Sequence, residues 1–109
     1  MATDLSALTP FRQSARVALD GTPDNLTQVT LPDWARVVTV AFKKNDGVTD
    51  DSGFLLFTGV DGASKGTNWF PIGSGGAYEF GVNPRATDGA VMFLAATTAT
   101  AWAHVMIER

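Results

Sequence analysis

The fold class is decided by residues 36–44, Arg36-Val37-Val38-Thr39-Val40-Ala41-Phe42-Lys43-Lys44. In this stretch Val38, Val40 and Phe42 lie two residues apart, and a period of two is typical of a β-strand that buries one face. β-Branched and aromatic side chains also favour a pleated backbone. We therefore expect a strand here, and the same pattern can be sought in the rest of the chain.

Seven further segments show strand patterns, and runs of Gly, Asp, Asn and Pro separate them. Residues 54–58 are continuously apolar, which predicts a strand buried on both faces. Residues 90–96 and 101–108 flank the short segment 97–100, and this spacing predicts a hairpin. The other predicted strands are residues 16–20, 27–31, 69–72 and 77–82, and residues 83–89 are predicted to be a loop.

About eight strands without a convincing helix predict an all-β protein, an antiparallel β-sandwich that is jelly-roll-like. The chain has 109 residues, a length typical of one domain, and we assign residues 14–109 to a single β-sandwich domain. Residues 1–13 are predicted to form an extended N-terminal arm. Pro10 opposes a helix there, and Leu5, Leu8 and Phe11 supply apolar anchors.

The composition argues against several functional classes. Eight Lys and Arg against eleven Asp and Glu give a formal net charge of -3, whereas nucleic-acid-binding domains carry a basic field. The chain has no Cys and one His, so it offers neither disulfides nor a multi-histidine metal cluster. It shows no signal-peptide pattern and no run of about 18 apolar residues. We therefore expect synthesis in a cytoplasm and no membrane or nucleic-acid partner.

No motif predicts a catalytic residue or a cofactor site. His104 is the one histidine, and the Gly-x-Ser-x-Gly turn of a serine hydrolase does not occur. The acidic residues Asp46, Asp50 and Asp51 fall in one loop, residues 45–53, which has two interpretations. It is an ordinary polar loop, in which Asp side chains bond their own backbone, or it holds a hard cation such as Ca²⁺. The prediction is that no residue serves as a metal ligand.

The large aromatic residues also have two interpretations. Trp34, Trp69, Tyr78 and Trp102 could form a platform for stacking sugars, or they could belong to the core and to a subunit interface. We predict an interface and assign it the apolar residues of the arm and the three tryptophans. These residues are Leu5, Leu8, Pro10, Phe11, Trp34, Trp69 and Trp102.

Several segments together resemble a family of small structural proteins of tailed-bacteriophage virions. They are Gln28-Val29-Thr30-Leu31-Pro32, Val37-Val38-Thr39-Val40-Ala41-Phe42, Phe70-Pro71-Ile72-Gly73, Gly76-Ala77-Tyr78-Glu79-Phe80, Val91-Met92-Phe93-Leu94-Ala95-Ala96 and Ala101-Trp102-Ala103-His104-Val105-Met106-Ile107-Glu108. The resemblance covers residues 27–109 and leaves the arm without a counterpart. It implies a β-sandwich of the cement or decoration type and no catalytic or cofactor-binding residues.

The resemblance also implies partners and a location. We expect a non-enzymatic protein on the capsid surface of a virion, bound to the major capsid protein or to other virion subunits. A homo-oligomer is expected, and a trimer would match the three-fold positions of an icosahedral lattice. The alternative is a carbohydrate-binding or host-recognition module of a phage tail or fibre. A cupin-type enzyme would need histidine and carboxylate metal ligands, and this chain has one His.

Overall fold

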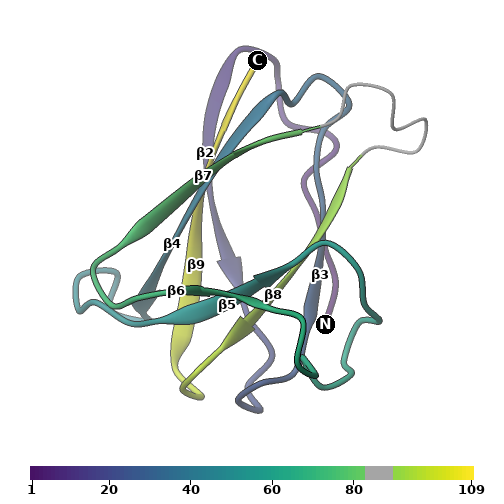
Figure 1. Cartoon of the computed structure of the whole chain (residues 1–109). Helices are drawn as coiled ribbons and strands as arrows, with labels where there is room; N and C mark the ends of the chain where they lie inside the picture. The colour runs from purple at the N-terminus through teal and green to yellow at the C-terminus, as the bar shows by residue number, and fades with distance from the viewer. Residues whose placement is uncertain (83–89) are drawn as a thin grey trace.

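The computed structural model describes residues 1–82 and 90–109, and these contain nine strands and no helix (Figure 1). The strands in chain order are β1 (Thr3–Asp4), β2 (Arg12–Ala18), β3 (Thr27–Thr30), β4 (Val37–Lys44), β5 (Gly53–Leu56), β6 (Phe70–Ile72), β7 (Ala77–Gly81), β8 (Val91–Ala96) and β9 (Ala101–Glu108). The predicted all-β class is confirmed. The predicted loop at residues 83–89 lies outside the described residues.

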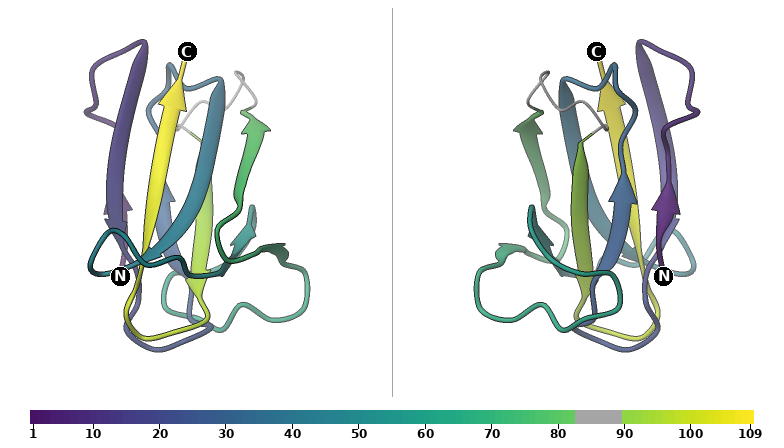
Figure 2. Two further views of the ribbon diagram at one scale, coloured as in Figure 1. Left: turned by 90° about the vertical axis from the view of Figure 1, so that its left-hand side faces the viewer. Right: turned by 90° about the vertical axis from the view of Figure 1, so that its right-hand side faces the viewer.

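The strands form two sheets with the orders β1-β3-β8-β5-β6 and β2-β9-β4-β7. All neighbours are antiparallel except β1 and β3, which pair in parallel. In the left panel of Figure 2 the second sheet faces the viewer, with β2, β9, β4 and β7 side by side. Both sheets contribute side chains to one apolar core, so the architecture is that of a β-sandwich.

The pairing of strands is nested. β2 pairs with β9, β3 with β8, β4 with β7 and β5 with β6, each time antiparallel. The innermost pair, β5 and β6, is the only consecutive pair of described strands that lies within one sheet. Every other connection between consecutive described strands from β2 to β9 crosses from one sheet to the other. The chain therefore winds around the core as one long folded-over hairpin.

The predicted hairpin of residues 90–96 and 101–108 is wrong. Both strands exist, as β8 and β9, but β8 pairs with β3 and β5 whereas β9 pairs with β2 and β4. The connection between them is anchored elsewhere, because the Thr97 hydroxyl donates to the carbonyl oxygen of Ser52 at 3.0 Å. A connection of this length suits a hairpin locally, but here it carries the chain from one sheet to the other.

The core follows the alternation that residues 36–44 predict. Val38, Val40 and Phe42 are almost fully buried between the sheets, as are Val29 and Leu31, the inward residues of the segment 27–31. The Phe42 ring lies against the backbone of Gly53 in β5, so closely that a β-carbon there would overlap the ring. Glycine at position 53 thus lets the opposite sheet approach the largest core side chain.

The segment 54–58 differs from its prediction at its end. β5 stops at Leu56, and Phe57 is 56% exposed. Leu55 points into the main core, whereas Phe54 and Leu56 belong to a second apolar cluster. Leu26 and Phe93 are the other large side chains of that cluster. Only the first part of the apolar run therefore lies in a strand that buries side chains on both faces.

The N-terminal segment lies along its own domain. Thr3 and Asp4 pair with Val29 and Thr30 as strand β1. Leu5 and Leu8 pack against the main core. β2 begins at Arg12, so the predicted boundary at residue 13 falls inside a strand. The apolar anchors of the first eight residues are thus used within the same chain.

Candidate interaction surfaces

A groove with a volume of about 490 Å³ lies on the outer face of the sheet β2-β9-β4-β7. It forms because neighbouring outward positions carry side chains of very different length. In one row across the sheet Arg16 lies beside His104 and His104 beside Ala41, and in the next row Ser14, Met106 and Thr39 are neighbours. The lining residues are Ser14, Ala15, Arg16, Thr39, Ala41, His104, Val105 and Met106.

His104 is the titratable side chain at the centre of this groove. Its Nε2 atom is buried and has no hydrogen-bond partner among the described residues. Burial lowers the pKa of His104, and the positive charges of Arg16 and Lys43 lower it further. The imidazole is therefore neutral at pH 7. A buried ring nitrogen of this kind can accept or donate one hydrogen bond to a group that enters the groove.

Arg16 forms one wall of the groove and is held in place by two contacts. Its guanidinium lies 4.2 Å from the centre of the Trp102 ring, and its Nη2 donates to the carbonyl oxygen of Asn45 at 2.6 Å. Both contacts leave the positive charge without a carboxylate, because neither an indole nor a carbonyl neutralises it. Trp102, which we predicted as an interface residue, thus serves as a platform for Arg16.

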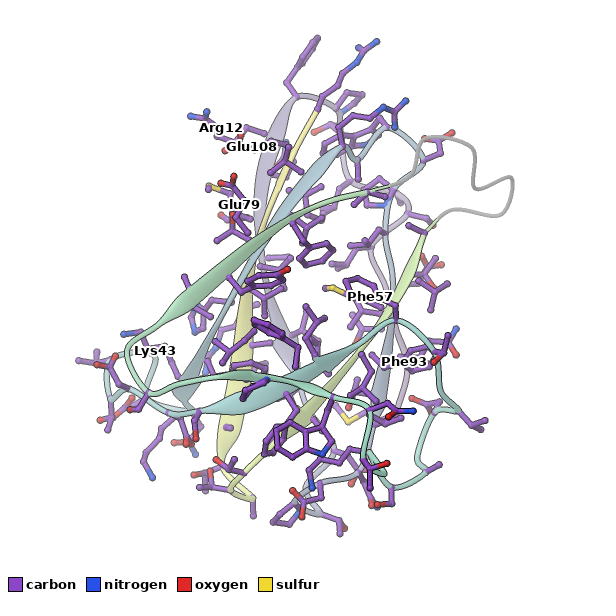
Figure 3. The ribbon with its side chains drawn as sticks, viewed as in Figure 1. Arg12, Lys43, Phe57, Glu79, Phe93 and Glu108 are labelled. Atoms are coloured by element: carbon purple, nitrogen blue, oxygen red, sulfur yellow. The ribbon has the colours of Figure 1, made fainter. Side chains whose placement is uncertain are left out.

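Two ion pairs also lie on this face, together with the exposed carboxylate of Glu79 on β7. Arg12 Nε lies 3.2 Å from Glu108 Oε1, and Lys43 contacts Asp50 (Figure 3). These pairs mark two ends of the sheet, as the labels Arg12, Glu108 and Lys43 show in Figure 3. Paired surface charges add little stability, but they leave a face of low net charge around the groove.

The aspartates of residues 45–53 do not converge. Asp46 accepts hydrogen bonds from the backbone N–H groups of Val48 and Thr49, and the Thr49 hydroxyl and these N–H groups lower the pKa of Asp46 to about 2. Asp50 pairs with Lys43. Asp51 is buried instead. It accepts a hydrogen bond from the Thr98 hydroxyl at 2.6 Å, in the connection between β8 and β9.

These contacts bear on the two interpretations of the loop. Asp46 bonds its own backbone, as in an ordinary polar loop. No group of three His, Asp or Glu side chains able to hold a metal ion occurs in residues 1–82 and 90–109. The three carboxylates therefore have three separate structural partners.

The predicted interface residues of the arm divide into two sets. Leu5 and Leu8 pack on the core together with Trp34, whose indole Nε1 donates to the carbonyl oxygen of Leu8 at 2.9 Å. Pro10 and Phe11 are exposed at the end of the molecule where β2 begins. Phe11 is 71% exposed and has a φ of 93°, an unusual conformation for a residue other than glycine.

The four large aromatic residues of the predicted platform lie apart. Within the described residues no ring contact joins two of them directly. Trp69 is 37% exposed and packs edge-on against Phe54 at 4.6 Å, with the Lys65 ammonium over both rings. Tyr78 instead contacts Phe70 and Phe80. The structure therefore gives no flat surface shared by Trp34, Trp69, Tyr78 and Trp102.

A row of aromatic rings between the two sheets is absent from the sequence-based prediction. We call it the aromatic edge, and it consists of Phe57, Phe70, Tyr78 and Phe80, which contact one another in series with centroid distances of 4.4 to 5.9 Å. Phe57 points toward the space between the sheets in Figure 3. Phe70 and Ile72, and likewise Tyr78 and Phe80, lie two residues apart in the sequence, which indicates that each pair shares one face of its strand. This spacing does not show that β6 and β7 are the last strands of their sheets.

The chain matches no known protein-family model, and no curated protein is significantly similar to it in sequence. Among the residues that the structure describes, none forms a helix with the length and apolar character required to cross a bilayer.

Proposed function

We propose that this chain is a non-enzymatic structural protein of a bacteriophage virion, and that it binds and stabilises the head as a capsid cement or decoration protein. It is made in the host cytoplasm and then occupies the capsid surface, where its partner is the major capsid protein or another virion subunit. The proposal combines the resemblance of residues 27–109 to phage structural proteins with the winding of the chain.

The observation that supports this proposal most directly is the nested order in which the strands pair. With β1 set aside, eight strands form the sheets β2-β9-β4-β7 and β3-β8-β5-β6, and their nested antiparallel pairs support a jelly roll. We therefore propose the jelly-roll fold for β2 to β9, with β1 as an addition. Jelly rolls recur in viral capsid and lectin domains, and both occur among the structures a virion displays.

The outer face of β2-β9-β4-β7 is the surface that we assign to the capsid. Apart from Arg16, its groove is lined by short or neutral side chains, and within each of the pairs Arg12–Glu108 and Lys43–Asp50 the two charges balance. Such a face loses little hydration energy when a partner covers it. No carboxylate of residues 1–82 or 90–109 pairs with the Arg16 guanidinium, so a carboxylate or backbone carbonyl of the shell would complete its contacts.

The experiment that tests this assignment compares two alanine-to-glutamate variants for binding to particles that lack the protein. Ala41→Glu places a charged side chain in the groove beside His104, and we expect binding to fall at least tenfold. Ala99→Glu, in the exposed connection before β9, is the matched control and should bind as the wild type does. Equal binding by both variants would remove the groove from the proposal.

Deletion of residues 1–13 cannot by itself show whether the N-terminal arm contacts the capsid. It would remove β1, the start of β2 and the Leu5 and Leu8 side chains that pack on the core, so loss of binding would follow from loss of structure. Phe11→Ser avoids this problem, because the ring is 71% exposed. If the arm contributes to the capsid contact, this single change weakens particle binding without changing the melting temperature.

Recognition of a host glycan by a tail or fibre is the second candidate function, and the exposed indole of Trp69 is the observation that favours it. An aromatic face beside a lysine suits stacking and hydrogen bonding to a sugar. A glycan array with the wild type and Trp69→Ala tests it, since binding by the wild type alone would support this function. Trp34→Ala is uninformative here, because Trp34 is packed on the core.

A further inference from the structure

The aromatic edge occupies the side of the sandwich where both sheets end. β6 is the last strand of one sheet and β7 the last strand of the other, and the short connection between them lies at the left of Figure 1. Phe70 comes from β6 and Tyr78 and Phe80 from β7, while Phe57 follows directly after β5. The four rings thus bridge the two sheets at their open side.

Two of these rings remain largely exposed although they continue the core. Phe80 is 9% exposed, whereas Phe57, only 5.1 Å from it, is 56% exposed and Phe70 is 47% exposed. With about 200 Å² for a phenyl side chain, the two rings leave roughly 200 Å² of apolar surface in water. That is close to half the non-polar area, about 450 Å², that one partner contributes to a stable interface of standard size.

We propose that a second copy of this chain covers the aromatic edge, so that Phe57 and Phe70 of each copy pack against the same rings of the other. This inference does not depend on the virion assignment. In an isologous contact the same patch of each copy faces the other. A charge in the patch would face the same charge of the partner, so the patch has to be free of unbalanced charge. The aromatic edge meets that condition, since its four side chains are neutral and aromatic rings pair favourably with one another.

The surroundings of the aromatic edge fit the same partner. The connection from β6 to β7, residues 73–76, consists of small neutral residues that allow close approach. Asp50 is the charged side chain near Gly75, and it is paired with Lys43. Glu79 lies on β7 itself, so direct pairing of two β7 edges about their midpoint would place two Glu79 carboxylates together. The contact is therefore made by rings and not by strand pairing.

The test is the molar mass of the full chain in solution, measured by analytical ultracentrifugation across the micromolar range. The wild type should sediment as a dimer, since one isologous patch closes with two copies. The double variant Phe57→Ser/Phe70→Ser should sediment as a monomer with an unchanged β-sheet circular dichroism spectrum. Phe11→Ser is the matched control, because it removes a more exposed phenyl ring from a different surface, and it should remain oligomeric.

Hydrogen exchange of the wild type keeps the proposal testable if the double variant fails to fold. Raising the protein concentration should slow exchange at residues 70–72 and 77–81 and leave the loop 45–49 unchanged. A wild type that is monomeric throughout, or an oligomer whose protected residues lie outside the aromatic edge, would overturn the proposal. Particle binding can fail while the chain still self-associates, so this outcome is distinct from failure of the proposed function.

Discussion

The indole Nε1 of Trp34 donates a 2.9 Å hydrogen bond to the carbonyl oxygen of Leu8, and this contact joins the N-terminal segment to the turn before β4. Twenty-six positions separate the two residues. Together with the packing of Leu5 and Leu8 on the core, the bond makes the first residues part of the folded domain. It also allows the energetic contribution of the segment to be measured with single substitutions.

Trp34→Phe should lower the free energy of unfolding by about 1 kcal/mol, because it removes the donor and leaves the Leu8 carbonyl without this partner. The aromatic packing is largely retained. Urea unfolding of the wild type and the variant measures the difference. Trp102→Phe is a suitable control, since its half-buried ring comes from β9 and lies under Arg16, away from the N-terminal segment's contact with Trp34. An unchanged unfolding midpoint for Trp34→Phe would show that the N-terminal segment is not held by this bond.

Asp51→Ala should destabilise the fold by about 1–3 kcal/mol at neutral pH, because the Thr98 hydroxyl and the Ser52 N–H lose their acceptor. Burial raises the pKa of Asp51, but the hydrogen bonds from Thr98 and Ser52 and the charge of Lys44 outweigh it and lower the pKa below 3.8. A lowered carboxyl pKa stabilises the native state above the unfolded value and less as pH falls through the folded value.

The pH dependence of this effect gives an independent check. The stability difference between the wild type and Asp51→Ala should be constant above about pH 5 and should shrink as the pH falls below about 4. Urea unfolding at several acidic pH values measures it. A difference that grows on acidification would mean that Asp51 is not held as a carboxylate in the native state.

His104 should titrate below its ordinary value of 6.5, because burial and the charges of Arg16 and Lys43 all disfavour the imidazolium. Stability is then complete above the unfolded pKa and decreases as the pH falls from there toward the folded pKa, since the unfolded chain binds the proton more readily. The chain has one His, so proton NMR follows a single imidazole signal. A midpoint above 6.5 would contradict the placement of His104 between these cations.

Gly53→Ala should destabilise the protein by about 1–3 kcal/mol, because the added methyl would overlap the Phe42 ring in a fully packed core. Thermal unfolding measures the loss. Gly21→Ala is the control, since nothing lies within 4 Å of a β-carbon at position 21, and it should melt close to the wild type. If the two variants have equal melting temperatures, the close approach of β5 to Phe42 is not present in solution.

The strands that were predicted well are those whose pattern is local. Val38, Val40 and Phe42 alternate with outward residues, and burial on one face of a sheet requires that period. Residues 27–31 follow the same rule, with Val29 and Leu31 inward. For such segments the sequence alone predicts the strand and its buried face, because the hydrophobic period is read from consecutive residues.

The order of strands could not be predicted, because it depends on contacts between distant residues. The segments that form β8 and β9 look like a hairpin locally, but β8 pairs with β3 and β5 whereas β9 pairs with β2 and β4, and all four partners are distant in sequence. The groove and the aromatic edge also depend on the order of the strands in the two sheets. The groove needs β2, β9 and β4 to be neighbours, and the aromatic edge needs β6 and β7 to end different sheets.

The copy number of this protein in purified phage particles, measured by quantitative mass spectrometry against the major capsid protein, tests the capsid assignment most directly. A protein that covers the capsid lattice should be present in a copy number of the same order as that of the major capsid protein. Absence of the protein from the particles would contradict the assignment to the capsid, and a copy number of only a few per particle would place it in the tail or at a vertex instead.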